Sequence, residues 1–180
     1  MKGRRTVLFV GVMAMLGLVA GTFLQGGSLA QKLCFLIGAA VLTGIAYINK
    51  QKMYVMLEIV ISISATIAFW DVSELWKYII FVGAGIIGVW YLIQIKFAKE
   101  DKYWPIGGLG LLLIAAGLAT SAAMHPMLFN AFLGLGGIFI SIYSAVGLFY
   151  YKVKIAALWL ILNIFFSLNP MMIVFSKLFS

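Results

Sequence analysis

The chain has 180 residues, of which 64% are hydrophobic and 10% are charged, and its mean hydropathy is +1.12. A soluble domain is roughly 45–50% apolar and about 25% charged, and so few polar side chains could not cover this chain in water. The formal net charge is +8, but the basic residues form short clusters rather than one stripe, which argues against nucleic acid as a partner. The composition indicates an integral membrane protein, with the lipid bilayer as its first partner.

Seven apolar segments follow one another along the chain, and each approaches the 20 or so residues that cross a hydrocarbon core of about 30 Å. We predict spans at 6–25, 31–49, 53–70, 75–96, 104–123, 127–150 and 153–175. The first is longer than the roughly 7–15 apolar residues of a signal peptide, so we expect it to remain uncleaved. Because the gaps are short, the sequence predicts one all-α helical bundle, a single integral membrane domain over residues 1–180.

The positive residues are divided unequally between alternate gaps. Four clusters occupy every second gap: Lys2, Arg4 and Arg5; Lys50 and Lys52; Lys96, Lys99 and Lys102; Lys152 and Lys154. The remaining gaps and the carboxyl end hold only Lys32, Lys77 and Lys177. Since positively charged loops stay in the cytoplasm, the pattern predicts a multi-pass cell-membrane protein with a cytoplasmic amino terminus and an external carboxyl terminus.

The chain also contains a candidate internal repeat. A shift of 96 residues aligns spans one to three with spans five to seven, and several identical residues coincide: Gly11 with Gly107, Gly21 with Gly117, Gly38 with Gly134, and Tyr47 with Tyr143. Lys50 and Lys52 fall on Lys152 and Lys154 after a small insertion. Units four spans apart point the same way, so the pattern predicts a parallel repeat of three helices, a linker helix and three helices, as in several secondary transporters.

Glycines recur within the spans and predict close approach of helix backbones. Gly17 and Gly21 are four residues apart, and Gly134, Gly136 and Gly137 form a cluster. We interpret these positions as packing sites rather than hinges, because glycine is common in membrane helices.

Glu58 is the one ionisable side chain well inside a predicted span, about 9 Å along the helix from Lys52. A charged group at depth indicates function by default. Glu58 is therefore a candidate site for proton or cation coupling, or an acceptor for a polar solute. The alternative is that Glu58 reaches headgroup water or pairs with Lys52 or Lys154.

Asn163 lies near the predicted bilayer midplane, and Ser62 lines the helix that the repeat makes its counterpart. An amide both donates and accepts hydrogen bonds, which suits it to hold a sugar hydroxyl or another amide. It is equally suited to bonding a neighbouring helix.

No pattern in the chain indicates an enzyme, a cofactor or a metal centre. General acid–base catalysis needs two titratable groups within reach of one substrate, and the predicted interior offers only Glu58. Cys34 is the single cysteine, and His125 is the single histidine and precedes Pro126 in a turn. We therefore expect no catalytic residues, no cofactor and no metal ligands.

The segment 158–163, Leu-Trp-Leu-Ile-Leu-Asn, follows the basic loop 151–154 and a span rich in Gly and Ser. Together with Gly-Val-Trp-Tyr at 88–91, it resembles PnuC-type vitamin transporters, whose fold is that of the SWEET sugar transporters. The resemblance implies a path for a small polar nutrient between two three-helix bundles and carries over Trp159 and Asn163 as ligand positions. Under this resemblance, spans two to four form the first bundle, whereas the internal repeat makes spans one to three the first unit. Both assignments remain open.

The leading hypothesis is a transporter of a small polar solute of the vitamin, nucleoside or sugar class, with Glu58, Ser62, Trp159 and Asn163 as the substrate site. The competing hypothesis is a non-transporting structural or assembly subunit of a membrane complex, because the predicted interior holds few hydrogen-bonding groups for a polar path. A second copy of the chain and other membrane subunits both remain open as partners.

Overall fold

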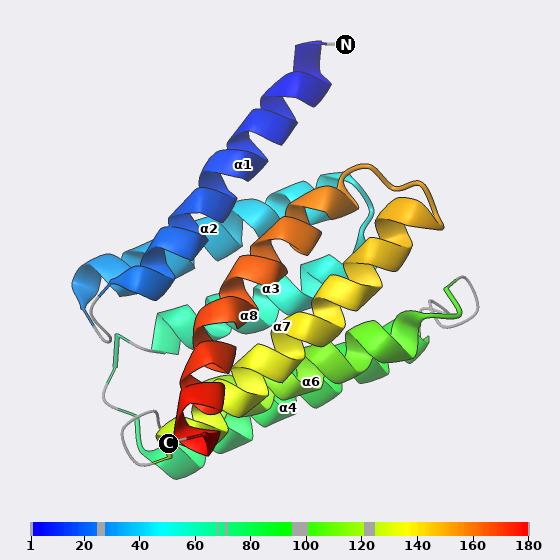
Figure 1. The fold of residues 1–180 in the computed structure, drawn as a ribbon. Coiled ribbons are helices and arrows are strands. Elements are labelled where there is room, and N and C mark those ends of the chain that lie inside the picture. The colour runs from blue at the N-terminus through cyan, green and yellow to red at the C-terminus, as the bar shows by residue number, and fades with distance from the viewer. Residues whose placement is uncertain are drawn as a thin grey trace.

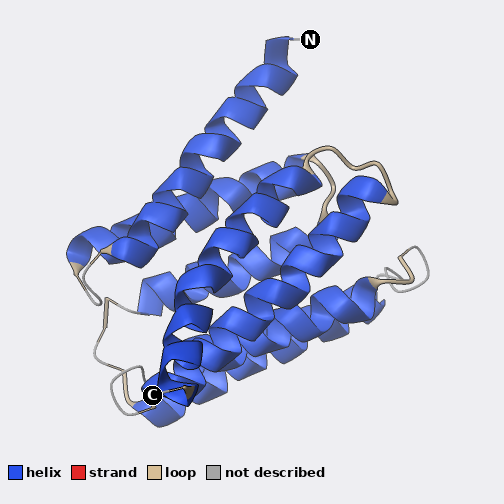
Figure 2. Ribbon diagram, viewed as in Figure 1, coloured by secondary structure: helices blue, strands red, loops and turns tan. Residues whose placement is uncertain are grey.

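The computed structural model describes residues 2–24, 28–67, 69–70, 72–94, 101–120 and 125–179, and its regular structure there is entirely helical (Figures 1 and 2). The helices are α1 (Lys2–Phe23), α2 (Leu29–Ile48), α3 (Lys52–Ile67), α4 (Glu74–Gln94), α6 (Trp104–Ala119), α7 (Pro126–Phe149) and α8 (Ala156–Leu178). The predicted all-α class is confirmed. Each predicted span corresponds to one of these helices, because the apolar runs and their polar punctuation set the helix ends.

Four helices are long and apolar enough to cross a membrane by length and composition: α2, residues 75–94 of α4, α7 and α8. Shorter apolar helices are formed by Thr6–Gly21 within α1 and by Trp104–Ala119. α3 has 16 residues and contains Lys52 and Glu58, which lower its hydropathy. The structure thus agrees with a membrane protein.

Successive helices pack against each other and alternate in direction (Figure 1). α2 packs against α1 and α3, and α7 packs against α6 and α8. α4 packs mainly on α6, while the contacts of α1 with α8 and of α3 with α6 join the two sets of three helices. The amino terminus and the turns after α2 and α7 lie at one end of the bundle, and the carboxyl terminus lies at the other (Figure 1).

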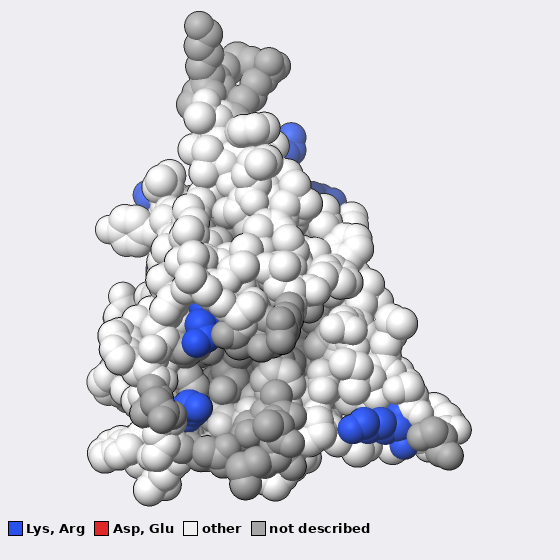
Figure 3. Space-filling model, turned by 90° about the vertical axis from the view of Figure 1, so that its left-hand side faces the viewer, with Lys and Arg blue, Asp and Glu red and all other residues white. Residues whose placement is uncertain are grey.

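Large apolar side chains occupy both the core and the surface of this bundle. Leu42, Leu57, Ile114 and Trp159 are at most 1% exposed. The outer faces also carry exposed Leu, Ile and Phe side chains, and the view in Figure 3 shows a largely uncharged surface with a few separate Lys side chains. An apolar surface of this extent is suited to contact with lipid rather than water.

Glycines permit the closest helix crossings. A Cβ atom added at Gly136 would lie 2.9 Å from the Ile114 backbone nitrogen, and one at Gly134 would lie 2.5 Å from Met171 Sδ. The packing interpretation therefore holds for these positions and for Gly21, which faces Phe35. It is wrong for Gly17, where an added Cβ meets nothing within 4 Å.

The turns that follow α2 and α7 share an unusual backbone conformation. Lys50 and Lys152 have φ angles of 56° and 59°, in the left-handed region that non-glycine residues seldom adopt. After α2, the Gln51 N–H donates to the Ala46 carbonyl at 2.8 Å. This bond satisfies a carbonyl that the end of the helix leaves free, and the chain then reverses into α3. The corresponding turn after α7 is longer, so α8 begins at Ala156 rather than at the predicted residue 153.

Candidate functional site

Glu58 lies at the contact between α3 and α8, where it is fully buried. Trp159 Nε1 donates a hydrogen bond to Glu58 Oε1 at 3.0 Å, and Oε2 has no hydrogen-bond partner among the described residues. The alternative in which Glu58 reaches headgroup water is therefore wrong for this conformation. A buried carboxylate oxygen without a partner is costly, so the site favours a bound water, ion or solute group.

Asn163 and Glu58 line the same cavity, which has about 10 Å³ of space for the centre of a water molecule. One water needs roughly 10–15 Å³ by this measure, so the cavity holds at most about one. Asn163 Nδ2 donates to the Trp159 carbonyl at 2.8 Å. This bond lies within α8, and among the described residues the amide bonds no neighbouring helix. The amide oxygen is thus available to accept a hydrogen bond from a molecule in the cavity.

Ser62 is not part of this cavity, although it lies one helical turn beyond Glu58. It lines a separate, mostly apolar hollow of about 450 Å³ together with Thr43 and Thr66. The Ser62 hydroxyl oxygen is buried and has no hydrogen-bond partner among the described residues. Of the four predicted site residues, the structure thus brings together Glu58, Trp159 and Asn163 and leaves Ser62 apart.

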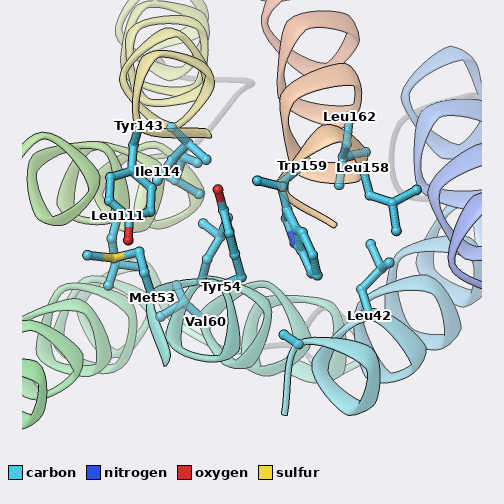
Figure 4. Close-up of a cluster of buried hydrophobic side chains, with 14 of the residues drawn as sticks. Leu42, Met53, Tyr54, Val60, Leu111, Ile114, Tyr143, Leu158, Trp159 and Leu162 are labelled. Atoms are coloured by element: carbon cyan, nitrogen blue, oxygen red, sulfur yellow. The ribbon is translucent and has the colours of Figure 1, made fainter. Parts of the chain in front are cut away.

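Tyr54 covers the side of this site that faces the turn after α2. Its ring stacks on the Trp159 indole with centroids 4.3 Å apart and planes 12° from parallel, as the adjacent side chains in Figure 4 show. The Tyr54 hydroxyl donates to Ser144 Oγ at 2.8 Å. Both rings are almost fully buried, and Tyr54 also borders a hollow at the end of the bundle.

That hollow has a volume of about 220 Å³ and is bordered by Lys50, Lys52, Tyr54 and Asp101, among others. Asp101, which is 7% exposed, accepts hydrogen bonds from several groups around this hollow. Asp101 Oδ2 accepts from the Tyr143 hydroxyl at 2.7 Å, and Oδ1 accepts from the Tyr151 hydroxyl at 3.0 Å and from the Tyr103 N–H at 2.9 Å. These bonds join α7 and the turn after it to the segment before α6.

Lys102 extends the same cluster outward. Its ammonium lies 5.0 Å from the ring centroids of both Tyr103 and Tyr150. The Tyr150 hydroxyl, followed by the Tyr103 hydroxyl, raises the pKa of the Lys102 ammonium above its ordinary value. The segment before α6 is thereby tied to the turn after α7.

The sequence reasoning missed this second polar cluster. Asp101 lies among the basic residues of a predicted loop, which makes it look like a solvated charge. The available signal was the phenol groups of Tyr54 and Tyr143 within apolar spans, because a buried tyrosine hydroxyl usually has a hydrogen-bond partner.

The described part of the chain contains no group of three His, Cys, Asp or Glu side chains that could hold a metal ion. His125 is exposed and begins the turn before α7. The chain matches no protein-family model, and no significant match was found among curated proteins or solved structures.

Proposed function

We propose that this protein is a cell-membrane transporter of a small polar solute, of the vitamin, nucleoside or sugar class. The observation that carries the proposal is the Glu58 carboxylate, which is fully buried, bonded on one oxygen to Trp159, and directed with Asn163 at a shared cavity. Ionisable groups at membrane depth commonly belong to substrate or ion pathways. Glu58, Trp159 and Asn163 form the proposed site, and Ser62 lies outside it.

The proposal includes seven spans. α1, α3 and α6 pack side by side with the four longer helices, and 16 helical residues extend about 24 Å, close to the thickness of the hydrocarbon core. The amino terminus, the turns that contain Lys50, Lys152 and Lys154, and the start of α3 at Lys52 lie at one end of the bundle (Figure 1). This segregation supports a cytoplasmic amino terminus.

Matched contacts support the parallel repeat of α1–α3 and α6–α8. A Cβ atom at Gly11 of α1 would lie 2.9 Å from Leu158 of α8, and one at Gly107 of α6 would lie 3.0 Å from Met53 of α3. Gly107 follows Gly11 by 96 residues, and Leu158 follows Met53 by 105. The two contacts that join the halves are therefore equivalent under the proposed repeat.

Glycine contacts within one half also recur at the equivalent positions of the other half. For this comparison each residue of α2 is matched with the residue of α7 that follows it by 98 positions. The matched pairs are Gly11 to Ile45 and Gly107 to Tyr143; Gly21 to Phe35 and Gly117 to Leu133; Gly38 to Leu18 and Gly136 to Ile114. These contacts favour pairing Gly38 with Gly136 instead of Gly134. The shift of two residues corresponds to a longer connection between the first two helices of the second half.

The cavity at Glu58 lies where the two proposed halves meet, and the described residues that line it form pairs related by the proposed repeat. The equivalent pairs are Leu18 and Ile114, Leu57 and Leu162, Glu58 and Asn163, and Ile61 and Phe166. Such a lining is expected at a pseudo-two-fold axis between parallel repeats, where transporter sites are found. Glu58 and Asn163 are equivalent positions, so only one half supplies an ionisable group.

The resemblance to PnuC-type transporters agrees with a site between two three-helix units. The contact pairs favour α1–α3 as the first unit, with α4 as the linker. They do not favour the alternative in which α2–α4 form the first unit. The placement of Trp159 and Asn163 beside Glu58 supports their role as ligand positions.

A second function, a structural or assembly subunit, is favoured by the size of the cavity. With space for about one water, the Glu58 cavity cannot hold a sugar or a nucleoside in the described conformation. Transport through this site therefore requires the helices that line the cavity to move apart. A subunit that only packs against partners requires no such opening.

Uptake into proteoliposomes distinguishes the two functions. We expect at least one member of a panel of vitamins, nucleosides and sugars to be taken up and to raise the melting temperature of the purified protein. The Asn163→Leu variant should lose uptake and Glu58→Gln should lower it or make it independent of pH, whereas Ser62→Ala should retain it. Absence of uptake and of any thermal shift, together with co-purification of a fixed membrane partner, would overturn the transporter proposal.

A further inference from the structure

A large hollow separates the amino-terminal part of α1 from the turn between α7 and α8. α1 approaches α8 closely at Gly11, where an added Cβ would lie 2.9 Å from Leu158. Towards its amino terminus α1 leaves the bundle, as Figure 1 shows. The space that opens there has a volume of about 850 Å³ and is lined by Val7 and Leu8 on one side and by Lys152 and Lys154 on the other.

The two sides of this hollow differ in chemistry. Val7, Leu8 and Ile48 form an apolar wall, and Leu8 and Ile48 remain 48% and 66% exposed. Lys152 and Lys154 are exposed and belong to the segment 152–155, whose Val153 and Ile155 also line the hollow. Asn49 and Gln51 add uncharged polar groups to the lining. None of the described residues that line the hollow is acidic. An occupant with an anionic head and an apolar tail matches both sides at once.

We propose that this hollow binds an acidic phospholipid, with its phosphate at Lys152 and Lys154 and its upper acyl chains against Val7, Leu8 and Ile48. Basic pockets between membrane helices at the cytoplasmic side recognise anionic headgroups. A zwitterionic lipid carries its own cation, which competes with the two lysines for the phosphate. A free phosphate ion satisfies the lysines but leaves the apolar wall exposed. The proposal requires membrane insertion and does not depend on transport.

The bound lipid occupies a defined place in the fold. It fills the space between α1 and the Lys152 turn, so it joins the first helix to the start of α8. Because α8 carries Trp159 and Asn163 close behind that turn, the lipid also stabilises the position of the helix that borders the Glu58 cavity.

Native mass spectrometry of the full chain, released from nanodiscs that contain equal amounts of phosphatidylglycerol and phosphatidylcholine, tests the proposal. We expect phosphatidylglycerol to be retained preferentially. Each lysine near the membrane surface contributes about a fivefold change in the affinity for an acidic lipid. The double variant Lys152→Gln/Lys154→Gln should therefore weaken retention on the order of 25-fold, whereas Lys152→Arg/Lys154→Arg should preserve it.

The double variant Lys32→Gln/Lys177→Gln removes the same charge elsewhere and serves as the matched control, which should bind like the unmodified chain. Val7→Trp fills the apolar side without changing charge and should lower retention of the lipid. Melting temperatures in detergent verify that each variant is folded. Equal loss in the control, unchanged retention in Lys152→Gln/Lys154→Gln, or displacement of the lipid by millimolar inorganic phosphate alone would overturn the proposal.

Discussion

Trp159 Nε1 and Glu58 Oε1 are 3.0 Å apart, and their hydrogen bond joins α8 to α3 across the centre of the bundle. Both side chains are fully buried, so neither group can exchange its partner for solvent without movement of the helices. The Tyr54 ring, stacked on the same indole, fixes its orientation. This bond therefore both holds the two proposed halves together and includes the ionisable group of the proposed site.

Removal of one partner of this bond should destabilise the fold more than removal of both. Trp159→Phe leaves the Glu58 carboxylate without a donor, which costs about 1–3 kcal/mol. Trp159→Phe combined with Glu58→Met replaces both partners by apolar groups, which can be nearly neutral. Unfolding by SDS titration in mixed micelles measures the free energy of each variant. Additive losses in the double variant would contradict a coupled pair.

Glu58→Gln keeps an oxygen that accepts from the Trp159 N–H and removes the ionisable group. We expect the variant to fold with an unchanged or higher melting temperature, because it no longer buries a carboxylate. If Glu58 couples transport to a proton or cation, uptake should fall or become independent of pH. Glu74→Gln, at the start of α4, makes the same substitution outside the proposed site and serves as the control. Unchanged uptake with unchanged pH dependence would assign Glu58 a packing role.

The two tyrosines that donate to Asp101 should contribute unequally. Tyr143 is 7% exposed and Tyr151 is 36% exposed, so only the loss of the Tyr143 hydroxyl leaves a buried carboxylate oxygen unsatisfied. Tyr143→Phe should cost about 1.5–3 kcal/mol, as expected for a hydrogen bond to a charged group, and Tyr151→Phe clearly less. Thermal unfolding in detergent compares the pair. Equal effects would show that water replaces both bonds.

Gly136 and Gly17 provide a matched test of helix packing. An alanine Cβ at Gly136 would lie 2.9 Å from the Ile114 nitrogen and 3.0 Å from the Gly110 oxygen, both of them backbone atoms, whereas one at Gly17 meets nothing within 4 Å. Gly136→Ala should therefore cost about 1–3 kcal/mol. Gly17→Ala should stabilise the helix by roughly 0.5–1 kcal/mol. Circular dichroism during thermal unfolding measures both, and equal effects would contradict the close crossing of α6 and α7.

Single-cysteine variants test the proposed orientation. In a Cys34→Ser background, an impermeant maleimide applied to intact cells should label the Lys177→Cys variant and leave the Lys154→Cys variant unlabelled. Both positions are exposed, so access depends on which side of the membrane they face. Permeabilised cells, in which both variants should be labelled, provide the control. Labelling of Lys154→Cys alone in intact cells would reverse the orientation.

The sequence by itself determined the helical membrane class and the approximate helix ends. These depend on local properties: the length of apolar runs, the absence of polar groups within them, and the charged or Gly- and Pro-containing gaps. The burial of Glu58 could not be predicted in this way, because the distance from Lys52 along α3 says nothing about which neighbour covers that face. The sequence left a headgroup contact open, and the structure excludes it in the described conformation.

Only the tertiary structure decided which polar groups meet. Trp159 is 101 residues from Glu58, and Tyr143 is 42 residues from Asp101. Such pairs depend on the rotation and crossing of packed helices, which a spacing along one helix does not specify. The same reason explains Ser62, which is one turn from Glu58 but faces the hollow beside α2. Local sequence sets where each helix begins and ends, and packing between helices decides which of its faces becomes a site.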